Sequence, residues 1–241
     1  MPTPQTFQSA AEKKAFDLKH RQTISYNIGK YNTAVKTGLG QFRDHELARS
    51  RGAYLKTQVI ENLDKYLLQF EENFRKRGGR VIWAETKEDA LREILAIFER
   101  KRARSVVKSK SMATEEIHLN EYLEAHGVEA VETDLGEYIC QLSGQKPYHI
   151  VTPVMHMSKE DISELFFQKL KTARTNDPQE LTLIARRILR EKYTSADVGI
   201  TGGNFLVADI GGVAITENEG NARLSVGFPK THIALVGIEK V

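Results

Sequence analysis

The segment that decides the fold is Ser105-Val106-Val107-Lys108-Ser109-Lys110-Ser111-Met112, in which a short apolar run is followed at once by polar residues. The two adjacent valines are typical of a buried β-strand, which we expect over residues 105–107. A helix should follow over residues 114–126, because Gly127 supplies the usual residue for a helix end. A strand, a polar loop and a helix in this order are the elements from which α/β folds are built.

The same alternation continues on both sides of this segment. Further strands are expected at residues 81–83, 128–131 and 149–151, and further helices at 86–102, 137–142, 158–170 and 177–192. Thr86 with Asp89 resembles a capping box, and Asp177-Pro178 is a typical helix start. After Asp197, runs of Val, Ile and Leu alternate with Gly and Asn, which predicts strands joined by tight turns and no helix. We therefore expect an α/β fold with a mostly parallel sheet and helices on both faces.

The N-terminal part differs from the rest in charge. Residues 1–60 carry ten Lys or Arg against four Asp or Glu, a net charge of +6 in a chain whose total is +3. Three glycines are expected to interrupt any long helix in this part: Gly29, Gly38 and Gly40. We expect a basic, partly extended arm over residues 1–50, then an α/β domain over residues 51–241 that opens with a helical extension over 53–76.

Composition excludes several classes of protein. The single cysteine, Cys140, rules out an internal disulfide framework, a cysteine-based zinc site and an iron–sulfur cluster held by this chain alone. No run approaches the roughly 18 apolar residues that span a bilayer, so we expect no membrane span and a cytoplasmic protein. The histidines lack metal-ligand spacing, so no metal site is expected. A basic arm can bind a nucleic acid or an acidic partner. This arm lacks a zinc-finger or RNA-binding signature, so we do not expect a nucleic acid.

Four polar segments follow predicted strands, where the loops of a parallel sheet meet at one edge. The first holds Lys108 to Ser111, the second Glu132 to Asp134, the third Pro153 and His156, and the fourth Gly202 to Asn204. Together they predict a pocket for a small ligand. The candidate ligand-binding residues are Lys108, Ser109, Lys110, Ser111, Glu132, Thr133, Asp134, Gly202, Gly203, Asn204, Asn218, Gly220, Asn221 and Arg223.

Lys108 and Lys110 are the most suggestive cations, because they precede a predicted helix N-terminus. Two ammonium groups beside free backbone amides would hold a phosphate or a carboxylate, so we expect a small anionic ligand. The alternative is that one lysine pairs with Glu115 or Glu116 while the other faces water. The spacing of a P-loop and the G-x-G-x-x-G of a dinucleotide site are both absent.

The segment Glu217-Asn218-Glu219-Gly220-Asn221, followed by Arg223, is the densest polar motif. Glu217 or Glu219 is a candidate nucleophile or general base. The alternative is a turn that uses Asn and Gly for their backbone freedom, and spacing alone favours the turn slightly.

These segments carry a resemblance to the lactate utilization protein B family. The matching motifs occur in order at residues 107–117, 132–138, 196–202, 204–205, 217–221, 232–233 and 237–241, and the resemblance runs from about residue 51 to 241. One departure is Ala208-Asp209-Ile210-Gly211-Gly212, where the family pattern has two threonines. The lost hydroxyl groups would have been ligand donors.

The resemblance implies an LUD domain with the fold shared by glucosamine-phosphate deaminases, ribose-phosphate isomerases and CoA transferases. It also implies a part in oxidising L-lactate to pyruvate, as one subunit of a three-protein lactate-utilization complex that transports electrons. Complete members continue into a ferredoxin-like region with two [4Fe–4S] clusters, whose cysteines this chain lacks. The chain therefore resembles the N-terminal domain alone, and no cofactor is expected in it.

The leading functional hypothesis is a ligand-binding or assembly domain of an iron–sulfur subunit. One alternative is an enzyme in its own right, of acyl-CoA or sugar-phosphate type, that uses Glu217 or Glu219. The other is a module that only binds partner subunits.

Overall fold

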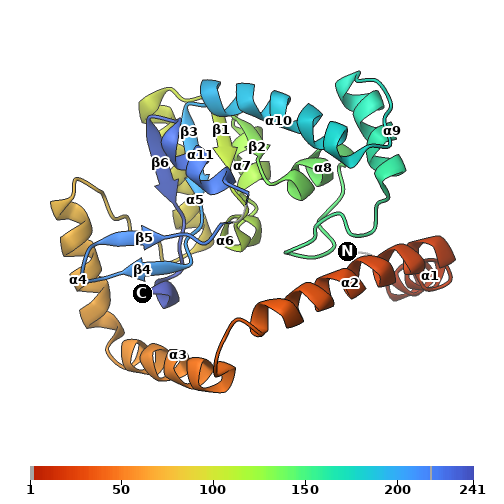
Figure 1. Ribbon diagram of the computed structural model, residues 1–241. Coiled ribbons are helices and arrows are strands. Elements are labelled where there is room, and N and C mark those ends of the chain that lie inside the picture. The colour runs from red at the N-terminus through yellow and green to blue at the C-terminus, as the bar shows by residue number, and fades with distance from the viewer. Residues whose placement is uncertain (1–2, 218) are drawn as a thin grey trace. The chain divides into compact units, whose positions relative to one another are not determined.

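The computed structural model describes residues 3–217 and 219–241 (Figure 1). The chain forms two compact units. The first contains residues up to Arg49 together with Ile139–Ile184, and the second contains Ser50–Tyr138 together with Ala185–Val241.

A four-stranded parallel sheet lies in the second unit, in the order β2-β1-β3-β6. The strands are β1 (Ser105–Lys108), β2 (Glu129–Glu132), β3 (Val198–Thr201) and β6 (Thr231–Ala234). Each neighbouring pair is parallel, with Val106 opposite Ala130 on one side and opposite Val198 on the other. A separate antiparallel pair consists of β4 (Phe205–Val207) and β5 (Gly212–Ala214). The predicted α/β fold with a mostly parallel sheet is confirmed.

One face of the sheet is covered by α5 (Lys87–Lys101) and α7 (Leu119–Ala125). Ile94 and Phe98 of α5 and Leu123 of α7 are buried in one apolar cluster with Val198 and Ile200 of β3. These residues alternate with polar ones at helical spacing, so each helix turns one apolar stripe toward the sheet.

The opposite face is covered by α11 (Asn221–Gly227). Because side chains alternate along a strand, Gly199 faces away from the cluster that holds Val198 and Ile200. A Cβ atom on Gly199 would lie 1.8 Å from the backbone oxygen of Ser225, so glycine is what lets α11 approach β3. Helices therefore cover both faces, as predicted, although the prediction of no helix after Asp197 is wrong.

Helix starts follow the predicted capping residues. Thr86 and Asp89 form a capping box at α5, and Ser158 and Asp161 form another at α9 (Lys159–Leu170). Proline opens α10 (Pro178–Ser195), and α8 covers Leu135–Ser143. The single helix expected over 114–126 is wrong: α6 (Met112–Glu116) ends before α7, and His118 between them has a φ of 56°.

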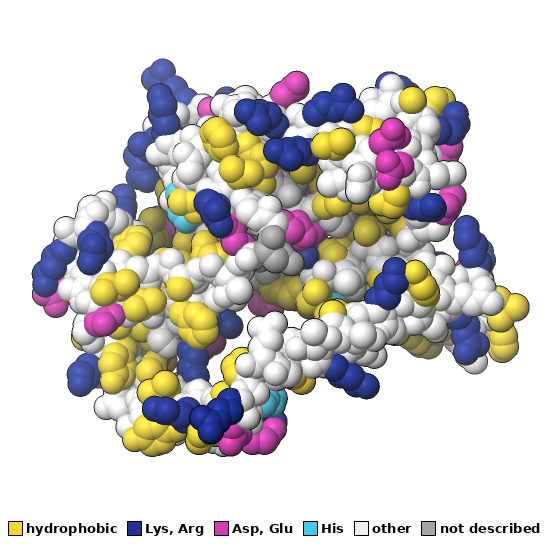
Figure 2. All heavy atoms as spheres, in the orientation of Figure 1, with side chains coloured by type: hydrophobic (Ala, Val, Ile, Leu, Met, Phe, Trp, Pro, Cys, Tyr) yellow, Lys and Arg dark blue, Asp and Glu magenta, His cyan; other side chains and the backbone are white. Residues whose placement is uncertain are grey.

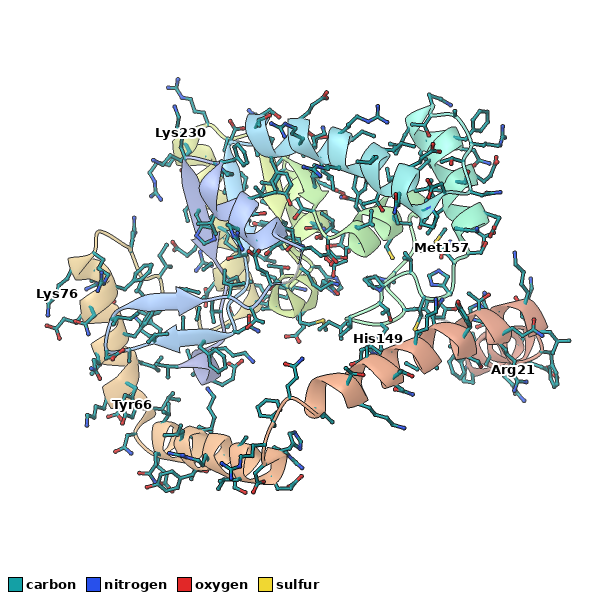
Figure 3. All side chains as sticks on the ribbon, in the orientation of Figure 1. Arg21, Tyr66, Lys76, His149, Met157 and Lys230 are labelled. Atoms are coloured by element: carbon teal, nitrogen blue, oxygen red, sulfur yellow. The ribbon has the colours of Figure 1, made fainter. Side chains whose placement is uncertain are left out.

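The extension that precedes the sheet is also divided. It forms α3 (His45–Ile60) and α4 (Leu63–Lys76) instead of one helix over 53–76. On α4, Asn73 donates a 2.9 Å hydrogen bond to the carbonyl oxygen of Ala208, in the turn between β4 and β5. Figure 3 shows Tyr66 and Lys76 on this helix beside the two-stranded hairpin.

Two predicted strands do not form. Residues 81–83 and 149–151 are irregular, and neither pairs with the sheet. Trp83 is 48% exposed and Val151 is 54% exposed, so these apolar runs are not buried as strands of a covered parallel sheet are.

The first unit contains α1 (Pro4–Ala15), α2 (Leu18–Leu39) and α9, with an irregular loop before α9. Gly29 and Gly38 lie within the 22-residue α2, so the prediction that glycines interrupt a long helix is wrong. Asn27 of α2 donates a 2.8 Å hydrogen bond to the Met155 carbonyl oxygen, and Figure 3 shows the loop through His149 and Met157 beside this helix. Whether residues 1–50 act as a separate arm stays a prediction.

Within the described ranges, none of the helices combines the length and the apolar character that crossing a membrane requires. Figure 2 shows hydrophobic and basic side chains side by side on the surface of α3, where Tyr54 and Leu55 are exposed.

Candidate functional site

Two lysine–carboxylate pairs lie in succession at the carboxyl ends of β1 and β2. Lys108 Nζ is 2.8 Å from Glu132 Oε1, and Lys110 Nζ is 2.9 Å from Asp134 Oδ2. Lys108 and Glu132 are direct partners in the parallel register. Lys110 and Asp134 lie two residues further along the chain, just beyond the ends of the two strands. We call these four residues, with Glu137, the charged cluster.

The inner pair is removed from solvent. Lys108 is 1% exposed, and its ammonium also donates a 2.8 Å hydrogen bond to the hydroxyl of Thr114 in α6. That hydroxyl donates in turn to the carbonyl oxygen of Ser111. Among the residues that the structure describes, Lys108 and Lys110 pair with Glu132 and Asp134 and not with the predicted alternatives Glu115 or Glu116. A buried lysine that is held by a carboxylate and a hydroxyl has a fixed position.

Glu137 of α8 adds a third carboxyl group beside the inner pair and is 4% exposed. Burial, together with the charge of the neighbouring Glu132 carboxylate and a side-chain hydrogen bond to it, raises the pKa of Glu137 to about 9. Glu137 therefore carries a proton at neutral pH and shares it with Glu132. Asn120 of α7 donates a 2.6 Å hydrogen bond to Glu132 Oε1.

One oxygen in this group lacks a hydrogen bond. Asn120 Oδ1 is buried, and it has no partner among the residues that the structure describes. Buried polar atoms in native proteins are nearly always paired, so each such atom calls for a ligand, a water molecule or a functional reason.

The segment after β2 fixes the start of α8. Asp134 Oδ1 accepts a 3.1 Å hydrogen bond from the Glu137 backbone N–H, so Asp134 caps the helix that carries Glu137. The Thr133 hydroxyl donates to the Lys108 carbonyl oxygen at 2.8 Å, which ties this loop to the end of β1. Asp134 thus positions Glu137 and neutralises Lys110.

The predicted loop after β3 lies next to the start of α6. A Cβ on Gly202 would lie 2.8 Å from the Ser111 hydroxyl, and Gly203 lies against Val213 and Val236. Asn204 instead accepts a 2.8 Å hydrogen bond from the Thr216 backbone N–H, so its side chain holds the hairpin. Ser109 and Ser111 are both buried.

The motif at 217–221 is divided between two roles. Glu217 accepts hydrogen bonds from the backbone N–H and the side chain of Arg223, at 2.9 and 3.0 Å, so it caps α11. Glu219 lies near the charged cluster, where burial and then the charge of Asp134 raise its pKa. Gly220 has a φ of 78°, as the predicted turn requires, and Asn221 begins α11. Asn218 lies outside the described residues.

The structure thus groups Lys108, Lys110, Glu132 and Asp134 as predicted, with Ser111 and Gly202 adjacent. Glu217 and Arg223 instead bond to each other at the start of α11, and Asn204 holds the hairpin. Asn120 and Glu137 were not predicted as ligand-binding residues. For Glu137 a signal was present, because it follows Asp134 by three residues, the spacing that places it in the first turn of a helix capped by Asp134. Within the part of the chain that the structure describes, no three His, Cys, Asp or Glu residues are grouped as metal ligands.

Comparison with known proteins gives one family. The LUD domain model matches residues 67–241. Lactate utilization protein B of Anoxybacillus flavithermus is 49% identical over 194 residues, which cover 80% of this chain and 41% of that protein. Lactate utilization protein B of Shouchella clausii is 43% identical over 98% of this chain and 50% of its own length.

A relative from Escherichia coli, named uncharacterized electron transport protein YkgF, is 47% identical over 80% of this chain and 41% of that protein. The chain therefore spans half or less of the length of these relatives. No solved structure matches.

Proposed function

Because the chain belongs to the LUD domain family, we propose that it acts in lactate utilization. In this proposal it is the ligand-binding or assembly domain of an iron–sulfur subunit that takes part in oxidising L-lactate to pyruvate. The relatives named for lactate utilization support the pathway, and the relative named as an electron transport protein supports the redox setting. The domain works in the cytoplasm with the other subunits of a lactate-utilization complex.

The observation that carries the ligand-binding role is the charged cluster. A lysine that is 1% exposed and a buried carboxyl group whose pKa is about 9 are expensive to build into a core, and such groups concentrate at functional sites. The cluster also lies at the carboxyl ends of parallel strands, where α/β proteins bind ligands. Lys110, with a side chain that is 22% exposed, is the cation that a small anion reaches.

The two [4Fe–4S] clusters of the proposal belong to other cysteines of the complete protein. Cys140 is this chain's single cysteine and is buried, and one thiolate does not hold such a cluster. The present chain therefore supplies recognition and assembly, not electron transfer.

The alternative enzyme that uses Glu217 receives no support from its geometry. The Glu217 carboxylate accepts hydrogen bonds from Arg223, which engage both of its oxygens. A nucleophile needs a free oxygen beside the reacting carbon.

A domain exchange tests the proposal. The homologous region of Lactate utilization protein B from Bacillus subtilis, which is 49% identical over 194 residues, would be replaced by the matching part of this chain. The chimera should restore growth on L-lactate as sole carbon source in a strain that lacks its own gene. Growth on pyruvate is the control for general fitness. A chimera that accumulates normally but supports growth only on pyruvate would contradict the proposal.

A further inference from the structure

The first unit contains a pocket that involves none of the residues of the charged cluster. Its volume is about 540 Å³, within the range of about 300–1,000 Å³ that is usual for the sites of small ligands. One wall is a single face of α2, because Asn27, Lys30, Tyr31 and Ala34 follow one another at helical spacing. The irregular loop before α9 and the start of α9 supply the remaining walls. We call this space the α2 pocket, and all of its lining residues belong to the first unit.

Contacts within the first unit hold the walls of the α2 pocket in place. Asn27 donates a 2.8 Å hydrogen bond to the Met155 carbonyl oxygen, which ties the loop to α2. On the same loop, the ring of Tyr148 stacks on that of His156 with centroids 4.1 Å apart, and the Tyr148 hydroxyl lies 3.2 Å from His20 Nε2. Figure 3 shows this loop beside α2. A ligand therefore enters a preformed pocket and does not have to order the loop, which favours its affinity.

The lining of the α2 pocket opposite α2 is mostly apolar. Five of its side chains come from the loop and from α9: Pro153, Val154, Met155, Met157 and Ile162. The two thioether side chains are flexible and polarisable, so they adapt to apolar groups of different shapes. An apolar ligand body that enters this space is removed from water, which is the main source of affinity for such groups.

Lys30 is the only charged residue among the described residues that line the α2 pocket. It is exposed and forms no ion pair within the described ranges, and its ammonium lies 4.4 Å from the centre of the Tyr26 ring. A cation–π contact at an exposed position is weak, and the flexible stem of lysine allows the ammonium to turn toward an anion. The α2 pocket thus combines an apolar interior with one positive charge at its mouth and no negative charge in its lining.

We propose that the α2 pocket binds a small amphipathic carboxylate, whose carboxylate pairs with Lys30 while its apolar chain or ring is buried against Met155, Met157 and Ile162. The lysine selects an anion over a cation of the same shape. The apolar lining selects a ligand with an apolar body over a short polar acid. This binding site goes beyond the proposed function and does not depend on it.

Calorimetry on the 241-residue chain tests the inference with four probes. Octanoate carries both recognised parts, octan-1-ol lacks the charge, octylammonium carries the opposite charge, and acetate lacks the apolar chain. Octanoate should bind about tenfold more tightly than octan-1-ol, the effect of one charge-assisted contact, and octylammonium should bind less well than either. Acetate should bind about 100-fold less tightly than octanoate, because it buries almost no apolar surface.

Methionine methyl signals in NMR spectra locate the ligand in the unaltered protein. The chain has four methionines. Met155 and Met157 line the α2 pocket, whereas Met112 begins α6, beside the charged cluster. Octanoate should shift the methyl signals of Met155 and Met157 and leave that of Met112 unchanged, with Met155→Leu and Met157→Leu used to assign the signals. A shift confined to Met112 would place the anion at the charged cluster and overturn the inference.

Variants then separate the two parts of the recognition. Lys30→Met should abolish the preference for octanoate over octan-1-ol, with octan-1-ol binding unchanged. Ala34→Trp should fill the α2 pocket and weaken both ligands about tenfold or more. Both positions are exposed, so neither substitution disturbs the interior of the first unit. Lys36→Met and Val35→Trp, at exposed positions of α2 outside the lining, are the matched controls.

Three results would overturn the inference. The first is that octanoate does not bind at millimolar concentration, and the second is that octanoate and octylammonium bind equally well. The third is that octanoate binds Lys30→Met and Ala34→Trp as tightly as wild type.

Discussion

Lys108 and Glu132 are direct neighbours across two parallel strands, and their side chains form an ion pair of 2.8 Å in the protein interior. Both side chains are almost completely buried, at 1% and 8% exposure. Two opposite charges at such a position stabilise each other only while both are present, because each alone would be an uncompensated charge in a medium of low dielectric constant. The pair therefore couples the end of β1 to the end of β2.

Lys108→Met should be strongly destabilising. Removal of one partner from a buried ion pair costs about 3–5 kcal/mol of unfolding free energy, whereas Lys108→Met with Glu132→Gln should recover part of this loss. Urea denaturation followed by circular dichroism measures both. The control is Lys76→Met, because Lys76 and its partner Glu72 are more than 60% exposed and such pairs contribute about 0–1 kcal/mol. Equal costs for the Lys108 and Lys76 variants would contradict the interpretation.

Much of this core could be predicted from the sequence. Strands β1 and β2 overlap the strands predicted at residues 105–107 and 128–131, and the capping box of Thr86 with Asp89 was recognisable from its spacing. Residues 81–83 are also apolar, but a strand forms only where a neighbouring strand supplies hydrogen bonds. The sequence of one segment does not show whether such a neighbour is present. The seven-residue α11 was not predicted, because the glycines around it suggested turns. Its packing depends on Gly199 of β3, where a side chain would collide with the helix, and this contact is not visible in the local sequence.

The site was predictable only in part. The polar residues that follow β1 and β2 were found because strand ends in a parallel sheet converge. That Lys108 pairs with Glu132 and not with Glu115 depends on the strand order and register, which short-range patterns do not define. Asn120 was missed because a single amide on an amphipathic helix has no distinctive spacing.

Gly199→Ala should destabilise the second unit. The new Cβ would lie 1.8 Å from the Ser225 backbone oxygen, so α11 must move away from β3. Overpacking of this kind costs about 1–3 kcal/mol and more where backbone must shift, and urea denaturation measures the loss. Gly227→Ala is the matched control in the same helix, because an added Cβ there contacts nothing within 4 Å. A neutral effect at Gly199 would mean that α11 is not packed on β3.

Asp197→Ala should cost about 1 kcal/mol at neutral pH, because Asp197 accepts hydrogen bonds from the backbone N–H groups of Arg104 and Ser105. The Arg104 hydrogen bond is the main reason that the pKa of Asp197 is lowered. A lowered pKa contributes stability above the ordinary value near 4, and this contribution is lost as pH falls through the folded-state pKa. The difference from wild type should therefore shrink in acid. Asp197→Asn, which keeps one acceptor, should show an intermediate loss.

The pH dependence of stability should identify Glu137. Its pKa is about 9 in the folded state, mainly through burial, whereas the unfolded chain has the ordinary value near 4.5. The folded state then binds a proton that the unfolded state has released, so the stability that this group contributes is complete below pH 4.5 and is lost progressively up to about pH 9. One proton gives a slope of about 1.4 kcal/mol per pH unit at most.

Glu137→Gln does not titrate in either state, so the unfolding free energy of this variant should rise relative to wild type between pH 5 and pH 9. Urea denaturation across this range measures the difference, with the exposed Glu116→Gln as the control that should stay parallel to wild type. Parallel curves for Glu137→Gln and wild type would show that Glu137 is ionised in the folded protein and that no proton is shared with Glu132.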